Sequence, residues 1–70
     1  MIDFILEGPD GRVVAIEVKA SAAPQRDADR HLRWLRERLG DRFAAGVVFH
    51  LGQRSGSLGD GIYALPVSAL

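Results

Sequence analysis

The 70-residue chain contains no cysteine, so neither disulfide bonds nor thiolate metal sites can stabilise it. Its two histidines, His31 and His50, argue against a zinc site built on imidazoles. No apolar run is long enough to cross a bilayer, and the N-terminus lacks the positive region and cleavage site of a signal peptide. We therefore expect a cytoplasmic protein that is stabilised by packing and does not contact a membrane.

An excess of either charge is also lacking. Nine basic and nine acidic residues give a formal net charge of zero, which provides no overall electrostatic attraction to nucleic acid. Lysine is nearly absent, because eight of the nine basic residues are arginine and only Lys19 remains. The hydrophobic fraction of 47% predicts one folded domain over residues 1–70. A chain of this size buries only about 60% of its unfolded surface, so the core is small.

Secondary structure follows from the spacing of apolar residues. Residues 2–7 and 12–20 are predicted to be strands, and the Gly8–Gly11 turn sequence joins them in a hairpin. A helix is predicted from Pro24 or Asp27 to Leu39, with Gly40 as its stop. Its buried stripe has three- and four-residue spacing and consists of Ala28, Leu32, Leu35 and Leu39.

The C-terminal half predicts two more strands. Residues 44–51 form an apolar run, typical of a strand that is covered on both faces. The glycine-rich residues 52–61 are predicted to be a loop, and Ile62–Val67 an edge strand because of Pro66. The order of elements is β-β-α-β-β. Because the strand–helix–strand crossover makes its two strands parallel, we expect an α/β fold with a mixed β-sheet.

Three polar side chains are predicted to meet on this sheet. Alternation along the second strand puts Glu17 and Lys19 on one face, and a hairpin loop of residues 8–12 brings Asp3 opposite Glu17. A one-residue slip would send Asp3 to the other face. Paired carboxylates suit Mg²⁺, and a nearby lysine can stabilise negative charge that develops on a phosphodiester. The pattern therefore predicts metal-assisted hydrolysis. The alternative is a solvated Glu17–Lys19 pair and an ordinary edge charge at Asp3.

This arrangement resembles a known superfamily. Asp3, followed after thirteen residues by Glu17-Val18-Lys19, is similar to the signature of the PD-(D/E)xK, or restriction-endonuclease-like, superfamily. The chain also resembles the C-terminal domain of unknown function of bacterial AAA-type ATPases. That likeness rests on Ile2–Glu7, Ala15–Ser21, Gly46–Val48 and Ala64–Leu70.

The resemblance implies a role for each residue of the signature. Asp3 and Glu17 would bind Mg²⁺ with help from the Val18 carbonyl, Lys19 would be the catalytic lysine, and DNA would be the substrate. The implied fold is a mixed sheet with helices on both faces. The chain departs from the pattern in lacking the superfamily's first helix and strand, which makes its core a truncated one. It also has Ile2 in place of the usual proline and Asp29 where some relatives have tyrosine.

Two other functions stay open. The domain is either a nuclease, or a non-catalytic assembly or regulatory module of an ATPase, or a small dimeric binding protein. An uncovered sheet face and edge favour a homodimer or association with an ATPase segment. The arginines of residues 26–38 are interpreted as a solvated helix face with pairs such as Asp29–Arg33, and the two histidines as a helix-surface and a strand-end residue rather than ligands.

Overall fold

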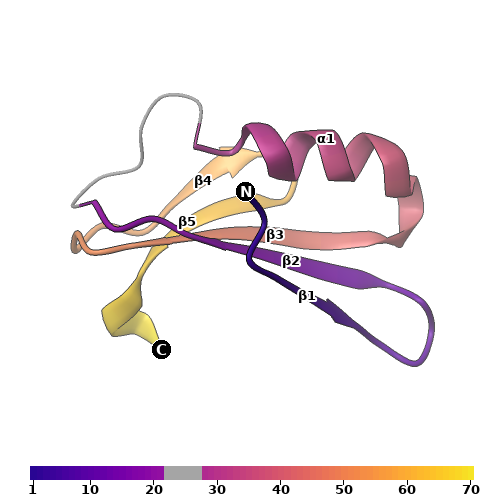
Figure 1. Ribbon diagram of the computed structural model, residues 1–70, viewed down its shortest axis with the longest axis horizontal. Coiled ribbons are helices and arrows are strands. Elements are labelled where there is room, and N and C mark those ends of the chain that lie inside the picture. Colours follow the sequence, from indigo (N-terminus) through magenta and orange to yellow (C-terminus); the bar gives the residue numbers. More distant parts are fainter. Residues whose placement is uncertain (22–27) are drawn as a thin grey trace.

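The chain folds as one mixed sheet with a single α-helix lying on one of its faces (Figure 1). The computed structural model describes residues 1–21 and 28–70. Its elements are β1 (Phe4–Glu7), β2 (Val13–Val18), α1 (Arg30–Leu39), the short 3₁₀ turn η1 (Gly40–Arg42), β3 (Phe43–His50), β4 (Gly56–Gly59), β5 (Ile62–Pro66) and the 3₁₀ turn η2 (Val67–Ala69). The predicted order β-β-α-β-β is confirmed, with β4 as an additional strand.

The N-terminal hairpin has the register that the loop length predicts. β1 and β2 are antiparallel, and their pairs run from Glu7 opposite Val13 to Phe4 opposite Ile16. The pairing ends there, and Asp3 lies outside β1. The turn between them is closed by hydrogen bonds from the Gly11 N–H to the Gly8 carbonyl and from the Gly8 N–H to the Arg12 carbonyl. Gly11 has a φ of 82°, a conformation that glycine adopts without strain.

The centre of the sheet is parallel, as predicted from the crossover. β2 pairs with β3 and β3 pairs with β5 in parallel, and the order across the sheet is β1-β2-β3-β5-β4. The prediction that residues 52–61 form only a loop is wrong, because β4 pairs antiparallel with β5. The prediction that Pro66 confines the last strand to an edge is therefore also wrong. Pro66 is tolerated because β4 ends its pairing at Ala64 and leaves the Pro66 position unpaired on that side.

The core lies between α1 and the face of the sheet beneath it. Leu32 of α1 is fully buried against this face, and Leu35 packs at its margin. Helix α1 begins at Arg30 and ends before Gly40, which has a φ of 55°. The starts proposed at Pro24 and Asp27 lie outside the described residues. No helix in the described part of the chain is long and apolar enough to cross a membrane. The buried cluster consists of Ala15, Ala28, Leu32, Val48 and Ile62.

The other face of the sheet has no α-helix on it among the described elements, so the expectation of helices on both faces is not met (Figure 1). This open face is built from alternate residues of the five strands: Phe4, Leu6, Val14, Ile16, Val18, Ala45, Val47, Phe49, Ser57, Tyr63 and Leu65. The apolar run in β3 predicted cover on both sides, but Val47 and Phe49 are only half-buried. The fold is thus two layers, a helix and a sheet.

Gly46 of β3 offers a test of the helix–sheet packing. A Cβ atom at this position would lie 2.9 Å from Phe43 Cζ and 3.3 Å from Leu32 Cδ1. We expect Gly46→Ala to lower the free energy of unfolding by about 1–3 kcal/mol, as overpacking does. Gly56→Ala is the matched control, because a Cβ there meets nothing within 4 Å, and a change within about 0.5 kcal/mol is expected. Urea denaturation measures both, and equal stabilities would contradict the packing described here.

Candidate functional site

Glu17 is the buried charged residue of the sheet. It follows Val13 and Ala15 on the face under α1, and its relative exposure is 0%. A carboxylate in this position loses its hydration and needs compensating partners. Neither carboxylate oxygen makes a hydrogen bond of good geometry to any described residue. Glu17 is therefore a polar group whose bonding capacity is not used within the fold.

The nearest groups to Glu17 are basic or can become so. Lys19 Nζ lies 3.3 Å from Glu17 Oε2, which confirms that the two side chains share a face. His31 Nδ1 of α1 lies 3.4 Å from Glu17 Oε1, and the amino group of Met1 lies 3.1 Å from the same oxygen. These are ion-pair distances without hydrogen-bond alignment, so the Coulomb attraction offsets part of the desolvation of Glu17 but leaves its lone pairs open.

His31 was assigned from the sequence to the helix surface, and the structure adds it to this cluster. The Met1 amino group lies 2.8 Å from His31 Nδ1, so Nδ1 accepts a hydrogen bond there when it carries no proton. The position of His31 could have been predicted from the order of the elements, because a crossover helix starts above the carboxyl end of the strand that it follows. The first turn of α1 thus lies over the end of β2.

The pairing of Asp3 opposite Glu17 that the hairpin predicts is not among the pairs of β1 and β2, which end at Phe4 opposite Ile16. Asp3 Oδ2 accepts a hydrogen bond of 2.7 Å from the Val18 N–H, and the Asp3 N–H donates to the Ile16 carbonyl at 2.9 Å. The side chain thus extends the ladder beyond the end of β1. Among the described residues, Lys19 pairs with Glu17 and not with Asp3. The three signature side chains lie at one end of two neighbouring strands, and two of them are in contact.

No group of three or more His, Cys, Asp or Glu side chains in residues 1–21 and 28–70 is arranged to hold a metal ion. The donors that are available are the two open oxygens of Glu17 and, across the strand pair, the carboxylate of Asp3. Carboxylate oxygens are the ligands that Mg²⁺ prefers, and Mg²⁺ usually keeps several waters and needs only one or two of them. The donor chemistry therefore fits Mg²⁺, provided that water or substrate completes its coordination.

His50 is a structural residue at the end of β3, as expected. It is 2% exposed and lies on the same face as Glu17. The Gly52 N–H donates to His50 Nδ1 at 3.0 Å, which leaves the proton on Nε2 to donate to the Arg54 carbonyl at 2.9 Å. Both ring nitrogens hold the loop that follows β3, so His50 has no free donor atom for a ligand.

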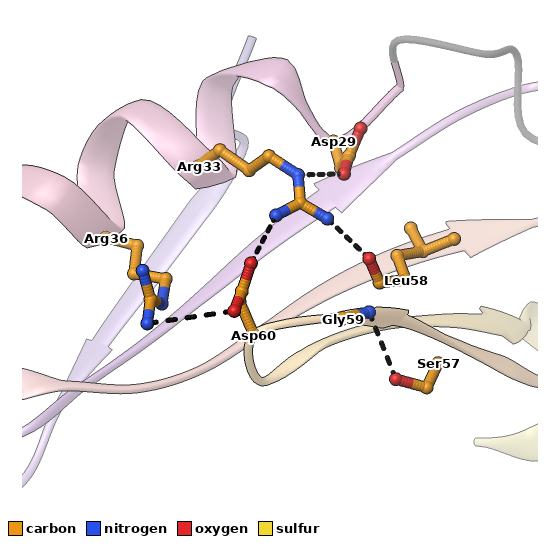
Figure 2. A network of polar contacts seen from close by, with 7 residues as sticks. All are labelled: Asp29, Arg33, Arg36, Ser57, Leu58, Gly59 and Asp60. Carbon is orange, nitrogen blue, oxygen red and sulfur yellow. Dashed lines mark hydrogen bonds and ion pairs between the residues drawn. The ribbon is translucent and has the colours of Figure 1, made fainter.

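Two arginines of α1, Arg33 and Arg36, form ion pairs with acidic residues of the same chain. Arg33 binds Asp29 through Nε at 2.5 Å, Asp60 through Nη1 at 2.8 Å and the Leu58 carbonyl through Nη2 (Figure 2). The hydrogen bonds to Asp29 and then to Asp60 raise the pKa of Arg33 above its usual value. Arg36 approaches the same Asp60 carboxylate at 4.0 Å. The predicted Asp29–Arg33 pair is confirmed. The contacts of Arg33 with Leu58 and Asp60 hold α1 against β4 and the turn that follows it.

The fold thus defines a small α/β domain whose polar cluster lies at the carboxyl ends of its parallel strands, where open α/β sheets place their binding sites. Residues 2–70 match the family model of the domain of unknown function DUF4143, and the chain belongs to this family. Neither the curated proteins nor the solved structures gave a match.

The stability of Glu17 variants tests whether the carboxylate serves the fold. Since Glu17 is buried without hydrogen bonds and Lys19 is 37% exposed, we expect Glu17→Met to raise the free energy of unfolding by about 1–3 kcal/mol. Glu7→Met is the control, because Glu7 is a 60% exposed carboxylate and its loss should change stability by no more than about 0.5 kcal/mol. A loss of several kcal/mol in Glu17→Met, measured by urea denaturation, would instead identify a structural ion pair.

The three contacts of Arg33 give a second test. Arg33→Lys keeps the charge but removes the planar fork that reaches three acceptors, so the thermal midpoint should fall. Arg36→Lys should leave the midpoint nearly unchanged, because Arg36 contributes one contact at 4.0 Å. Both midpoints are read from circular dichroism. Equal shifts in the two variants would mean that the attachment of α1 to β4 and the following turn does not depend on the three hydrogen bonds of Arg33.

Proposed function

We propose that this domain is a nuclease-like module of the PD-(D/E)xK type that hydrolyses phosphodiester bonds in DNA with Mg²⁺. The observation that carries the proposal is the buried Glu17 carboxylate, which lacks hydrogen bonds and has Lys19 Nζ at 3.3 Å. A fold that needed no ligand at this point would gain stability from an apolar residue there. Burying a carboxylate whose lone pairs are unused lowers stability, and binding of a ligand at that carboxylate would explain why the residue is an acid.

In this proposal the carboxylates hold the cation and Lys19 acts on the substrate. Glu17 and Asp3 would bind Mg²⁺, together with the Val18 carbonyl that lies between Glu17 and Lys19 in the chain. The bound ion supplies Lewis acidity and lowers the pKa of a coordinated water. The Lys19 ammonium would donate to a phosphate oxygen and stabilise the negative charge that develops there.

Access to Glu17 runs between two side chains that are themselves partly exposed. Lys19 is 37% exposed and His31 is 44% exposed, whereas the Glu17 side chain is only 1% exposed. Both neighbours are long or rotatable enough to move aside without disturbing the sheet. The DNA backbone would therefore approach the carboxyl ends of β2 and β3 from the side where the first turn of α1 begins.

A second candidate is a non-catalytic module with an assembly or regulatory role in an AAA-type ATPase. The observation that favours it is the closure of the site, because Glu17 is covered by α1 and paired with Lys19 while Asp3 is bound to the Val18 N–H. Under this alternative Asp3, Glu17 and Lys19 have a structural role, and their contacts hold the N-terminal hairpin and α1 together. The resemblance of the chain to the C-terminal domain of such ATPases supports the same alternative.

A metal titration separates the two candidates. The nuclease proposal predicts that adding Mg²⁺ or Mn²⁺ shifts or broadens the NMR signals of Asp3, Glu17 and Lys19 and leaves those of the Gly8–Gly11 turn unchanged. Glu17→Gln should abolish the response, because the neutral amide is a poor ligand for a hard cation. An unperturbed spectrum at high metal concentration in the folded wild-type protein would contradict the nuclease proposal and favour the non-catalytic module.

Catalysis is tested by nicking of supercoiled plasmid. If Lys19 stabilises the developing negative charge, Lys19→Met should lower the nicking rate by about 10²–10³-fold, and Glu17→Gln by at least as much. Glu7→Gln is the matched control, since it removes an exposed carboxylate from the same hairpin and should leave the rate unchanged. Nicking that persists in the Lys19 and Glu17 variants would show that it does not arise from this site.

A further inference from the structure

The open face of the sheet carries the strongest evidence for an interaction that the candidate site does not involve. It is defined by strand alternation on the side away from α1, and none of its strand positions is charged. Four of its side chains are well exposed: Phe4 and Leu6 at 59%, Val18 at 46% and Tyr63 at 43%. An exposed apolar face of this kind is a candidate interaction surface.

The exposed area is large enough to matter. A full aromatic side chain carries about 150–250 Å², so these four side chains alone leave on the order of 400 Å² of apolar surface in water. Ordinary monomers have a largest patch of about 300–600 Å², and a standard interface buries about 800 Å² on each partner. The half-buried side chains between the four, such as Ile16 and Val47, bring the face toward the size of an interface.

The pattern of residue types across the face is close to symmetric. One row, set by the strand register, runs Phe4, Ile16, Val47 and Tyr63 from β1 to β5. These four positions have an aromatic ring at each end and aliphatic side chains in the middle, and Ser57 of β4 follows beyond Tyr63. If a second copy is turned by a two-fold axis along the strands, Phe4 of one copy lies over Tyr63 of the other. The aliphatic centres then meet, and the rings pair in offset or edge-to-face geometry.

We propose that this face binds a second copy of the same chain, sheet against sheet, with the two α1 helices on the outside. Like faces meet in such an isologous pair, and a face without charges does so without repulsion. Two sheets pack about 10 Å apart, with interdigitated side chains. The exposed arginines of α1, Arg30, Arg36 and Arg38, stay in water. Glu17 and Lys19 lie on the opposite face, so this pairing is independent of the proposed nuclease activity.

Mass measurements give the first test. We expect the wild-type protein to sediment at twice the monomer mass of 7.6 kDa, and Phe4→Glu to sediment at 7.6 kDa with its circular dichroism unchanged, because Phe4 lies outside the core. Trp34→Glu is the matched control, since Trp34 is a 54% exposed aromatic residue on α1, and it should stay dimeric. A wild-type mass of 7.6 kDa up to high micromolar concentration, or a dimer that survives Phe4→Glu but not Trp34→Glu, would overturn the proposal.

Disulfide trapping tests the orientation. The chain has no cysteine, so Phe4→Cys combined with Tyr63→Cys introduces the only two thiols, and peptide mapping identifies which of them are joined. Within one chain these positions are three strand spacings apart, or about 14 Å, which is too far for a disulfide. Oxidation should therefore link two chains, whereas Phe4→Cys with Trp34→Cys should give little cross-linked product. Equal cross-linking in the two variants, or none in the first, would contradict the sheet-to-sheet arrangement.

Discussion

The burial of Glu17 beneath α1 is the constraint on which the interpretation of this domain depends. It follows from alternation in β2, where Val13 and Ala15 face the helix and the next residue in phase is an acid. The cost of such a burial is several kcal/mol before any compensation. Here the compensation is two ion-pair contacts, from Lys19 and the Met1 amino group, and a third contact from His31, which is ionic only when the ring is protonated. Neither carboxylate oxygen has a hydrogen-bond partner among the described residues, and this is the observation on which the proposed function rests. A small core has little stability to spare for a charge with no function.

The two faces of the sheet thus have different tasks. The face under α1 combines the core with the polar cluster, because a helix that covers the sheet also brings His31 over the end of β2. Arg33 holds this helix to the turn between β4 and β5, which keeps its first turn in place above Glu17 (Figure 2). The open face has no charged residue at its strand positions and is the surface proposed for association. A single layer of strands therefore separates the proposed chemistry from the proposed pairing.

Much of this arrangement could be predicted from local patterns. The Gly8–Gly11 turn sets the length of the hairpin loop, and that length places Glu7 opposite Val13 and Phe4 opposite Ile16. The stop at Gly40 and the pairing of Asp29 with Arg33 follow from helix geometry alone. Alternation in a strand needs no tertiary information, which is why the common face of Glu17 and Lys19 was also predictable.

The features that were missed depend on contacts between distant segments. β4 has the sequence Gly-Ser-Leu-Gly, with no alternation and no β-branched residue, and it is a strand only because the edge of β5 pairs with it. The same pairing moves β5 away from the edge position that Pro66 suggested. His31 looked like a surface residue because its own helix is polar on that side, and only the crossover brings it near β2. The carboxylate of Asp3 turns to the Val18 N–H where β1 ends, which no strand pattern encodes.

The most direct measurement of the central claim is the thermal midpoint of unfolding as a function of Mg²⁺ concentration. A ligand that binds only the folded state raises the midpoint as its concentration exceeds the dissociation constant. If the buried carboxylate is kept open for a cation, the wild-type midpoint rises with Mg²⁺ and that of Glu17→Gln does not. The same midpoint at all Mg²⁺ concentrations in the wild-type protein, or an equal rise in both proteins, would contradict the account.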